Sequence, residues 1–222
     1  MTATYDLRDS ALAVTLGKFP ATSYTVASTY CLDYFAELAK AAGSIDQASV
    51  ERAAGVLQSA YTSGATVFSC GNGGSAAISN HLQCDHLKGV RTETDLKPRV
   101  VSLSTNMALV TAIANDLGYE NVFSYQLESA ARPGDVLIAI SSSGRSPNIV
   151  RAIEWARQHE VATISLTGFS GGDSRKQADV AVHVECANYG IIEDLHQCVM
   201  HAIAQYIRQS RMSDDVVTVT TF

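Results

Sequence analysis

Residues 70–75 read Cys70-Gly71-Asn72-Gly73-Gly74-Ser75 and follow directly on an apolar, β-branched run at residues 66–69. A segment with helical spacing begins near residue 75. The glycines allow close approach of the backbone to a ligand, and a strand–turn–helix connection exposes N–H groups at the positive end of the helix. Taken alone, the turn predicts either an anion site or only a tight connection. It is not a nucleotide motif, because Ala76 breaks the GxGxxG pattern and no Gly-Lys-Ser or Gly-Lys-Thr follows.

A second turn of small residues, Ser141-Ser142-Ser143-Gly144-Arg145-Ser146, follows a later apolar run. Pro147 comes next, and proline is favoured in the first turn of a helix. A simple helix cap needs one hydroxyl, whereas this turn carries four serines. We therefore expect anion binding here rather than capping alone. The two turns together predict a pocket for a sugar phosphate.

Apolar runs and helical stretches alternate along the chain after residue 65. Strands are expected at residues 66–69, 99–103, 135–140, 162–166 and 180–184. Helices are expected at residues 75–88, 106–115, 122–131, 147–159 and 191–209. This alternation predicts an α/β fold with a five-stranded parallel sheet covered on both faces. Ligands bind such sheets at the carboxyl ends of the strands, where both turns fall.

The chain divides into a short arm, one domain and a tail. Residues 1–22 lack strong periodicity and are expected to form an N-terminal arm. Residues 23–62 show two runs of helical spacing, which predict a helical hairpin ahead of the sheet. We expect one domain over residues 23–212 and a tail over residues 213–222, with a strand at residues 216–220.

The composition of the chain argues against several classes of function. The net charge is −6 without a basic cluster, which argues against nucleic acid as a partner. The apolar runs are strand-sized, so no membrane span is expected, and the first residues show no secretory signal. The five cysteines form no CxxC pair, which indicates reduced thiols and predicts a cytoplasmic protein.

Two helices carry histidines beside carboxylates. His81 and Asp85 are four residues apart and share one helix face. Glu193 and His201 fall on one stripe of the last helix, although they are about 12 Å apart along its axis. Such pairs could hold a divalent metal or act as acid and base on a substrate. A single histidine is usually an ordinary core or surface residue, but two pairs favour a functional site.

Five motifs in this order resemble the sugar isomerase (SIS) domain and, within it, the phosphoheptose isomerase group. They are CGNGGS with SAAISNHLQCD (70–85), AIANDLGY (112–119), ISSSGRS (140–146), SLTG (165–168) and EDLHQCVMH (193–201). The resemblance spans residues 23–210. It implies a flavodoxin-like fold and a homotetramer with active sites at subunit interfaces. The implied reaction interconverts sedoheptulose 7-phosphate and D-glycero-D-manno-heptose 7-phosphate through an enediolate.

The resemblance also assigns residue roles. The phosphate group would be held by Ser141, Ser142, Ser143 and Ser146. The sugar would be lined by Asn72, Gly73, Gly74, Ser75, Asn115, Asp116 and Glu193. A divalent metal, zinc in this family, would be held by His81, Asp85, Glu193 and His201. Asp85 would be the catalytic base and His201 its acid/base partner.

Two site positions depart from the family pattern. Asp85 replaces the usual glutamate, which keeps a carboxylate but shortens it by one methylene. Glu193 replaces the usual glutamine, which adds a negative charge. We expect metal binding to survive both changes. The rival interpretation is a non-catalytic SIS protein, either a scaffold that resembles the DnaA initiator-associating protein or a sugar-phosphate sensor.

Overall fold

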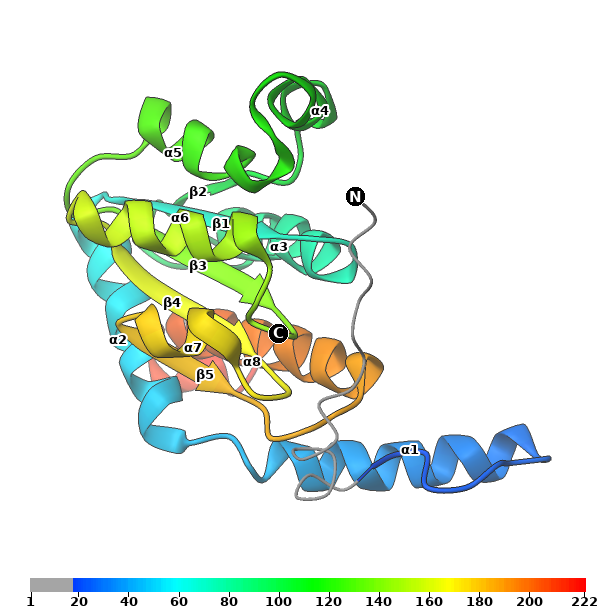
Figure 1. Ribbon diagram of the computed structural model, residues 1–222. Coiled ribbons are helices and arrows are strands. Elements are labelled where there is room, and N and C mark those ends of the chain that lie inside the picture. Colours follow the sequence, from blue (N-terminus) through cyan, green and yellow to red (C-terminus); the bar gives the residue numbers. More distant parts are fainter. Residues whose placement is uncertain (1–17) are drawn as a thin grey trace.

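Five parallel strands form the centre of the structure (Figure 1). The computed structural model describes residues 18–222, so most of the expected arm over residues 1–22 lies outside the described residues. The strands are β1 (Thr66–Gly71), β2 (Arg99–Ser102), β3 (Val136–Ser141), β4 (Ala162–Thr167) and β5 (Val180–His183). Their order is β2-β1-β3-β4-β5 with every pairing parallel. This is the flavodoxin-like order, and it confirms the predicted fold class.

Helices connect and cover the strands. They are α1 (Ala27–Ala42), α2 (Gln47–Ser63), α3 (Gly74–Cys84), α4 (Met107–Leu117), α5 (Ser124–Ala130), α6 (Pro147–Gln158), α7 (Gly172–Gln177), α8 (Tyr189–Gln209) and α9 (Asp214–Val217). A π-helical turn, η1 (Asp85–Val90), and a 3-10 turn, η2 (Tyr119–Asn121), complete the set. Across residues 18–222, none of these helices combines the length and the apolar character that a bilayer span requires.

Side chains of the central strand β3 point alternately into two apolar cores. Ile138 and Ile140 join the core shared with α2, α3 and α8, and Leu137 and Ala139 join the core shared with α5 and α6. Figure 1 shows α2 and α8 on one side of the sheet and α6 on the other. Both faces are therefore buried, which explains why the strands read as almost continuous apolar runs.

The order of the strands brings the two small-residue turns together. β1 and β3 are neighbours, with β2 on one side and β4 on the other. The glycine turn follows β1 and the serine turn follows β3. Connections leave these two strands in opposite directions along the sheet, which is the switch point where α/β folds bind ligands.

The two N-terminal helices are present but do not pack as a hairpin. They run in different directions, and each packs on the body of the molecule (Figure 1). α1 lies against the start of α8, where the Tyr34 hydroxyl donates a hydrogen bond to Asp194 at 2.6 Å. α2 buries Ala53 and Leu57 in the core against the sheet. α2 is thus covered by the sheet and α8, whereas α1 contacts α8 but leaves Leu32 and Phe35 exposed.

The strand expected at residues 216–220 is wrong. The tail instead forms the short helix α9, which begins with two acidic residues in its first turn. Arg208 holds the last residues, since its guanidinium lies 5.0 Å from the centroid of the Phe222 ring and bonds the carbonyl of Thr221. Valine and threonine favour strands only where a sheet can receive them, so packing decides here over propensity.

The helix expected at residues 75–88 is divided. α3 ends at Cys84, and the π-helical turn η1 continues from Asp85. Such turns insert an extra residue per turn and occur often at functional sites. Asp85 thus lies where the helix changes its pitch.

Candidate functional site

An open cavity of about 210 Å³ lies at the carboxyl ends of β1 and β3. Both turns contribute to it. Its lining residues are Asn72, Gly73, Gly74, Ser75, Ile140, Ser141, Ser142, Ser143, Ser146, Tyr189 and Glu193. All four serines of the second turn that were predicted to bind a phosphate therefore line one hollow with the glycine turn.

The serine turn is held rigidly by the loop that follows β4. The Gly168 N–H donates to the carbonyl of Ser142 at 2.8 Å, and the Ser174 N–H donates to the carbonyl of Gly144 at 3.0 Å. Gly144 has φ +65° and packs so closely on the carbonyl of Gly171 that a β-carbon would collide with it. The backbone of this turn is fixed before any ligand arrives.

Ser142 carries a polar atom that the described chain leaves unsatisfied. Its hydroxyl is buried and has no hydrogen-bond partner within residues 18–222. Buried polar atoms are nearly always paired in folded proteins. Within the same described residues, Ser165, Ser174 and His196 also carry unpaired buried polar atoms, and of these residues Ser142 alone lines the cavity.

Glu193 reaches the same cavity from α8. Its carboxylate lies against Gly74, where a β-carbon would collide with it. Burial and the nearby Asp194 carboxylate raise the pKa of Glu193. The cavity therefore carries one acidic group next to neutral hydroxyl and N–H donors.

Three side chains, from α3, η1 and α8, converge on one another. Asp85 lies between two imidazoles, with one carboxylate oxygen 3.2 Å from His81 Nε2 and the other 3.2 Å from His201 Nε2. The two Nε2 atoms are 3.1 Å apart. One ligand atom from each of the three residues lies within 4.8 Å of the others. The structure thus brings together Asp85 and His201, which are far apart in the sequence.

The chemistry of this group fits a divalent cation. Only one of two facing imidazole nitrogens can donate to the other, and the carboxylate only accepts when ionised. A shared cation satisfies all three at once, and imidazole and carboxylate are common zinc ligands. Glu193 is not in this group and lines the cavity instead. Gln197, which bonds His201 at 2.9 Å, is the α8 residue beside it.

Two helices, α3 and α8, run from the cavity to the three-residue group. α3 begins at Gly74 in the cavity wall and carries His81 seven residues later, about 10 Å along its axis. α8 packs on α3 and carries both Glu193 and His201. A sugar phosphate anchored in the serine turn could therefore extend toward Asp85.

Asn115 and Asp116 are not brought to the cavity. Both are exposed on α4, where the Asn115 amide donates to the Asp116 carboxylate at 2.8 Å. The residue of this motif that reaches the site is Tyr119, whose hydroxyl bonds Asn72 at 2.9 Å. The roles of Asn115 and Asp116 stay predictions.

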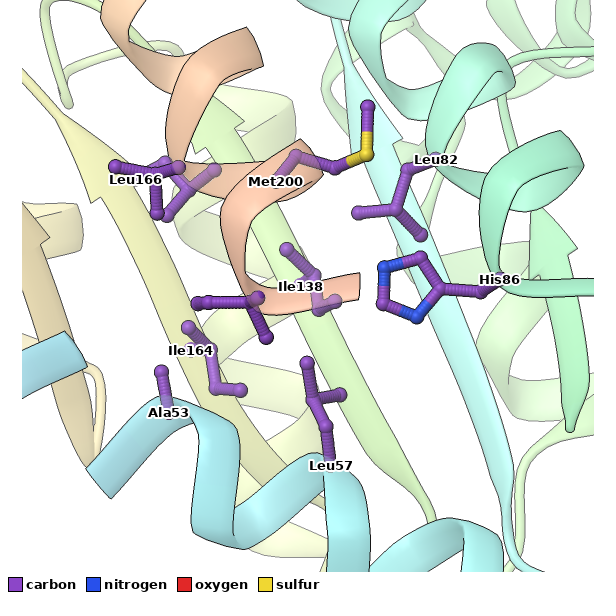
Figure 2. Close-up of a pocket in the computed structure, with 10 residues that line it drawn as sticks. Ala53, Leu57, Leu82, His86, Ile138, Ile164, Leu166 and Met200 are labelled. Atoms are coloured by element: carbon purple, nitrogen blue, oxygen red, sulfur yellow. The ribbon is translucent and has the colours of Figure 1, made fainter. Parts of the chain in front are cut away.

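A separate small cavity of about 20 Å³ lies in the core between α2, α8 and the sheet (Figure 2). Its walls are apolar apart from His86, whose ring lies below Leu82 and points toward Ile138 in Figure 2. Burial lowers the pKa of His86 to about 4, and its ring is hydrogen-bonded to the Tyr61 hydroxyl. A space of this size with one polar group does not suit a sugar, so His86 belongs to the core.

Sequence reasoning missed three residues around the site. Gln197 shares the stripe of Glu193 and His201 and stands one helical turn before His201, but it is given no role in the sequence analysis. Tyr189 lines the cavity from the first residue of α8. Asn148 pairs with Asn72 from the start of α6. Among the three, Gln197 alone has a sequence signal, namely its spacing of four from His201.

Comparisons with known proteins identify the family of this chain. The SIS domain family matches residues 31–168. The phosphoheptose isomerase of Akkermansia muciniphila is 37% identical over 177 residues, which cover 80% of this chain and 90% of that protein. The one from Rhodospirillum rubrum is 36% identical over 165 residues, covering 74% and 87%. The structure of phosphoheptose isomerase GmhA from Neisseria gonorrhoeae superposes with a TM-score of 0.75 at 31% identity, covering 83% of this chain and all of that one. The chain therefore belongs to the SIS domain family and, within it, to the phosphoheptose isomerases.

Proposed function

We propose that the protein is an aldose–ketose isomerase that converts sedoheptulose 7-phosphate into D-glycero-D-manno-heptose 7-phosphate. The observation that carries this proposal is the convergence of His81, Asp85 and His201 on the two helices that also wall the serine cavity. Relatives that are 36% and 37% identical to this chain carry the name of this activity.

The serine turn would hold the phosphate group. Ser141, Ser142, Ser143 and Ser146 line the cavity beside the start of α6, whose N–H groups favour an anion. Because this end of the substrate does not react, its binding energy can position the reacting carbons. The glycine turn, from Asn72 to Ser75, would contact the sugar.

Asp85 would move the proton. Its carboxylate removes a proton from the carbon next to the carbonyl, and an enediolate forms. The same proton then returns to the former carbonyl carbon, while His201 transfers a proton between the two oxygens. Atoms and electrons balance within the substrate, so the reaction needs no external oxidant or reductant.

His81, Asp85 and His201 would hold a divalent metal, with zinc as the proposed ion. When bound, it would supply a positive charge that polarises the sugar carbonyl. Glu193 remains a proposed contact of the sugar and, by family resemblance, of the metal. Its place in the cavity supports the first of these roles.

We further propose a homotetramer with active sites at subunit interfaces. The side chains of His81 and His201 are 51% and 40% exposed, so a neighbouring copy could close the site. α1 exposes Val26, Leu32 and Phe35, which offers an apolar surface for such a contact. The five cysteines are free thiols, and a cytoplasmic location stays a prediction.

One experiment separates the candidate functions. The purified protein is analysed for bound metal, for its mass in solution and for turnover of sedoheptulose 7-phosphate. Metal with turnover supports the isomerase. Binding of the sugar phosphate without turnover would instead indicate a sensor, and the absence of binding, metal and turnover would indicate a scaffold.

A further inference from the structure

Asn72 is held by two residues that stand outside the predicted site. Its Nδ2 donates to Asn148 Oδ1 at 2.9 Å, and Asn148 Nδ2 donates back to Asn72 Oδ1 at 2.8 Å. The Tyr119 hydroxyl donates to the same Asn72 Oδ1 at 2.9 Å. The Asn72 amide is thus bound on both sides by protein groups.

This arrangement leaves the Asn72 side chain little capacity for a ligand. A carbonyl oxygen has two lone pairs, and both are occupied by Asn148 and Tyr119. One of the two Nδ2 hydrogens is also used. We therefore infer that the Asn72 amide mainly bonds other residues of the protein. The glycine turn would then contact the sugar through its backbone.

The two partners come from different connections. Asn148 is 1% exposed and is the second residue of α6, directly after the serine turn. Its Oδ1 also accepts from the Ile149 N–H at 3.0 Å, so the amide is fixed at the start of that helix. Tyr119 begins the turn η2, and its hydroxyl reaches Asn72 although 53% of the residue is exposed.

We propose that Tyr119 and Asn148 are positioning residues that clamp the glycine turn to the serine turn through Asn72. The clamp spans the switch point between β1 and β3 and fixes the distance between the phosphate end and the sugar end of the cavity. This inference rests on the proposed function. Through Tyr119, the segment that contains Asn115 and Asp116 would also contribute to the site, because its tyrosine positions Asn72.

The test compares a ligand that contacts the serine turn alone with a ligand that contacts both the serine turn and the glycine turn. Inorganic phosphate would contact the serine turn alone, whereas sedoheptulose 7-phosphate needs both turns. We expect Tyr119→Phe to lower kcat/KM for sedoheptulose 7-phosphate about fivefold, the effect of one lost hydrogen bond. Inhibition by inorganic phosphate should change less than about twofold, and the Tm should fall by no more than about 2–4 °C. Tyr125→Phe removes another half-exposed hydroxyl, one for which no contact with the site is seen, and is the matched control.

A double variant shows whether both residues act through Asn72. Asn148→Ala should lower kcat/KM more than Tyr119→Phe, because it removes both bonds of the amide pair. Tyr119→Phe combined with Asn148→Ala should then be no worse than Asn148→Ala alone. Additive losses, a parallel loss of phosphate inhibition, or a Tyr119→Phe protein equal to the parent would each overturn the clamp.

The experiment distinguishes a failure of the proposed clamp from a failure of the proposed isomerase function. A parent protein without turnover would refute the isomerase but not the clamp. In that case calorimetry on the parent and Tyr119→Phe proteins tests the clamp. It measures the ratio of the Kd values for sedoheptulose 7-phosphate and inorganic phosphate in each protein. An unchanged ratio, or no binding of either compound, would overturn the clamp.

Discussion

The two halves of the site are built in opposite ways. The serine turn consists of buried backbone locked to the next loop at Gly144 and Gly171. The group of His81, Asp85 and His201 consists of partly exposed side chains that project from helix surfaces. One half is fixed by packing, whereas the other half depends on what binds between its side chains.

The difference indicates a division of labour. A rigid cradle binds the unreactive phosphate without reorganising, so its contribution does not change during the reaction. The histidines and Asp85 must accept and release protons or a cation, which needs accessible side chains. Damage to the first half should therefore weaken binding, and damage to the second half should lower turnover.

The strongest test of this division is Asp85→Asn. The amide cannot take the proton from carbon, so we expect kcat to fall by about 10²- to 10⁴-fold. The Kd for sedoheptulose 7-phosphate should change only a few-fold, because the serine turn is untouched. Isomerase kinetics and calorimetry on the same preparations measure both quantities. Asp95→Asn, at an exposed position, is the control, and full activity of Asp85→Asn would remove Asp85 from the role of base.

Metal removal is the next largest effect. A chelator should lower activity about a hundredfold or more, since the positive charge on the carbonyl is worth several kcal/mol. Phosphate inhibition constants cannot be read without turnover, so calorimetry follows phosphate binding, which should persist. His81→Gln should lose the metal, and His159→Gln, which alters a ring stacked on Trp155, should keep it. A metal-free protein with full turnover would contradict the assignment.

The sequence could predict the fold and the local pairs but not their convergence. The alternation of apolar runs with helical stretches predicts the parallel sheet. The spacing of four residues predicts that His81 lies next to Asp85. The approach of His201 to these residues follows from helix packing, which no local pattern contains. The family resemblance supplied it instead. The π-helical turn at Asp85 likewise has no signal in composition.

Two errors have a common physical cause. The tail was read as a strand from its valines and threonines, and residues 23–62 were read as a hairpin from their periodicity. The tail forms the helix α9 and contacts Arg208, and each of the two N-terminal helices packs on α8. Propensity describes a segment by itself, whereas the partner is decided by the whole fold.

Gly144→Ala tests the rigid half. Its positive φ and its contact with the Gly171 carbonyl leave no space for a methyl group, so we expect a loss of about 1–3 kcal/mol in the free energy of unfolding. KM for sedoheptulose 7-phosphate should rise while kcat changes less. Gly55→Ala is the matched control, since it lies within α2 with open space around it and should gain up to about 1 kcal/mol. Denaturant unfolding measures the free energy of unfolding of both variants and of the parent.

Glu193→Gln should give the smallest effect, and the size of this effect depends on pH. Burial and Asp194 raise the pKa of Glu193, so the ionised carboxylate costs stability in the folded protein. This cost is absent below the unfolded pKa of about 4.3 and grows until the pH passes the folded pKa. Glu193→Gln should therefore be more stable than the parent at pH 7 and equal to it near pH 4, as thermal unfolding at each pH would show.

The same charge opposes a bound phosphate. Glu193 shares the cavity with the serine turn, so removing its charge should tighten inorganic phosphate about two- to fivefold at pH 7. Glu51→Gln, on the exposed face of α2, should leave phosphate affinity unchanged. Metal content should stay at the parent level, because His81, Asp85 and His201 form their group without Glu193. A loss of metal in Glu193→Gln would instead place this carboxylate in the adjustable half of the site.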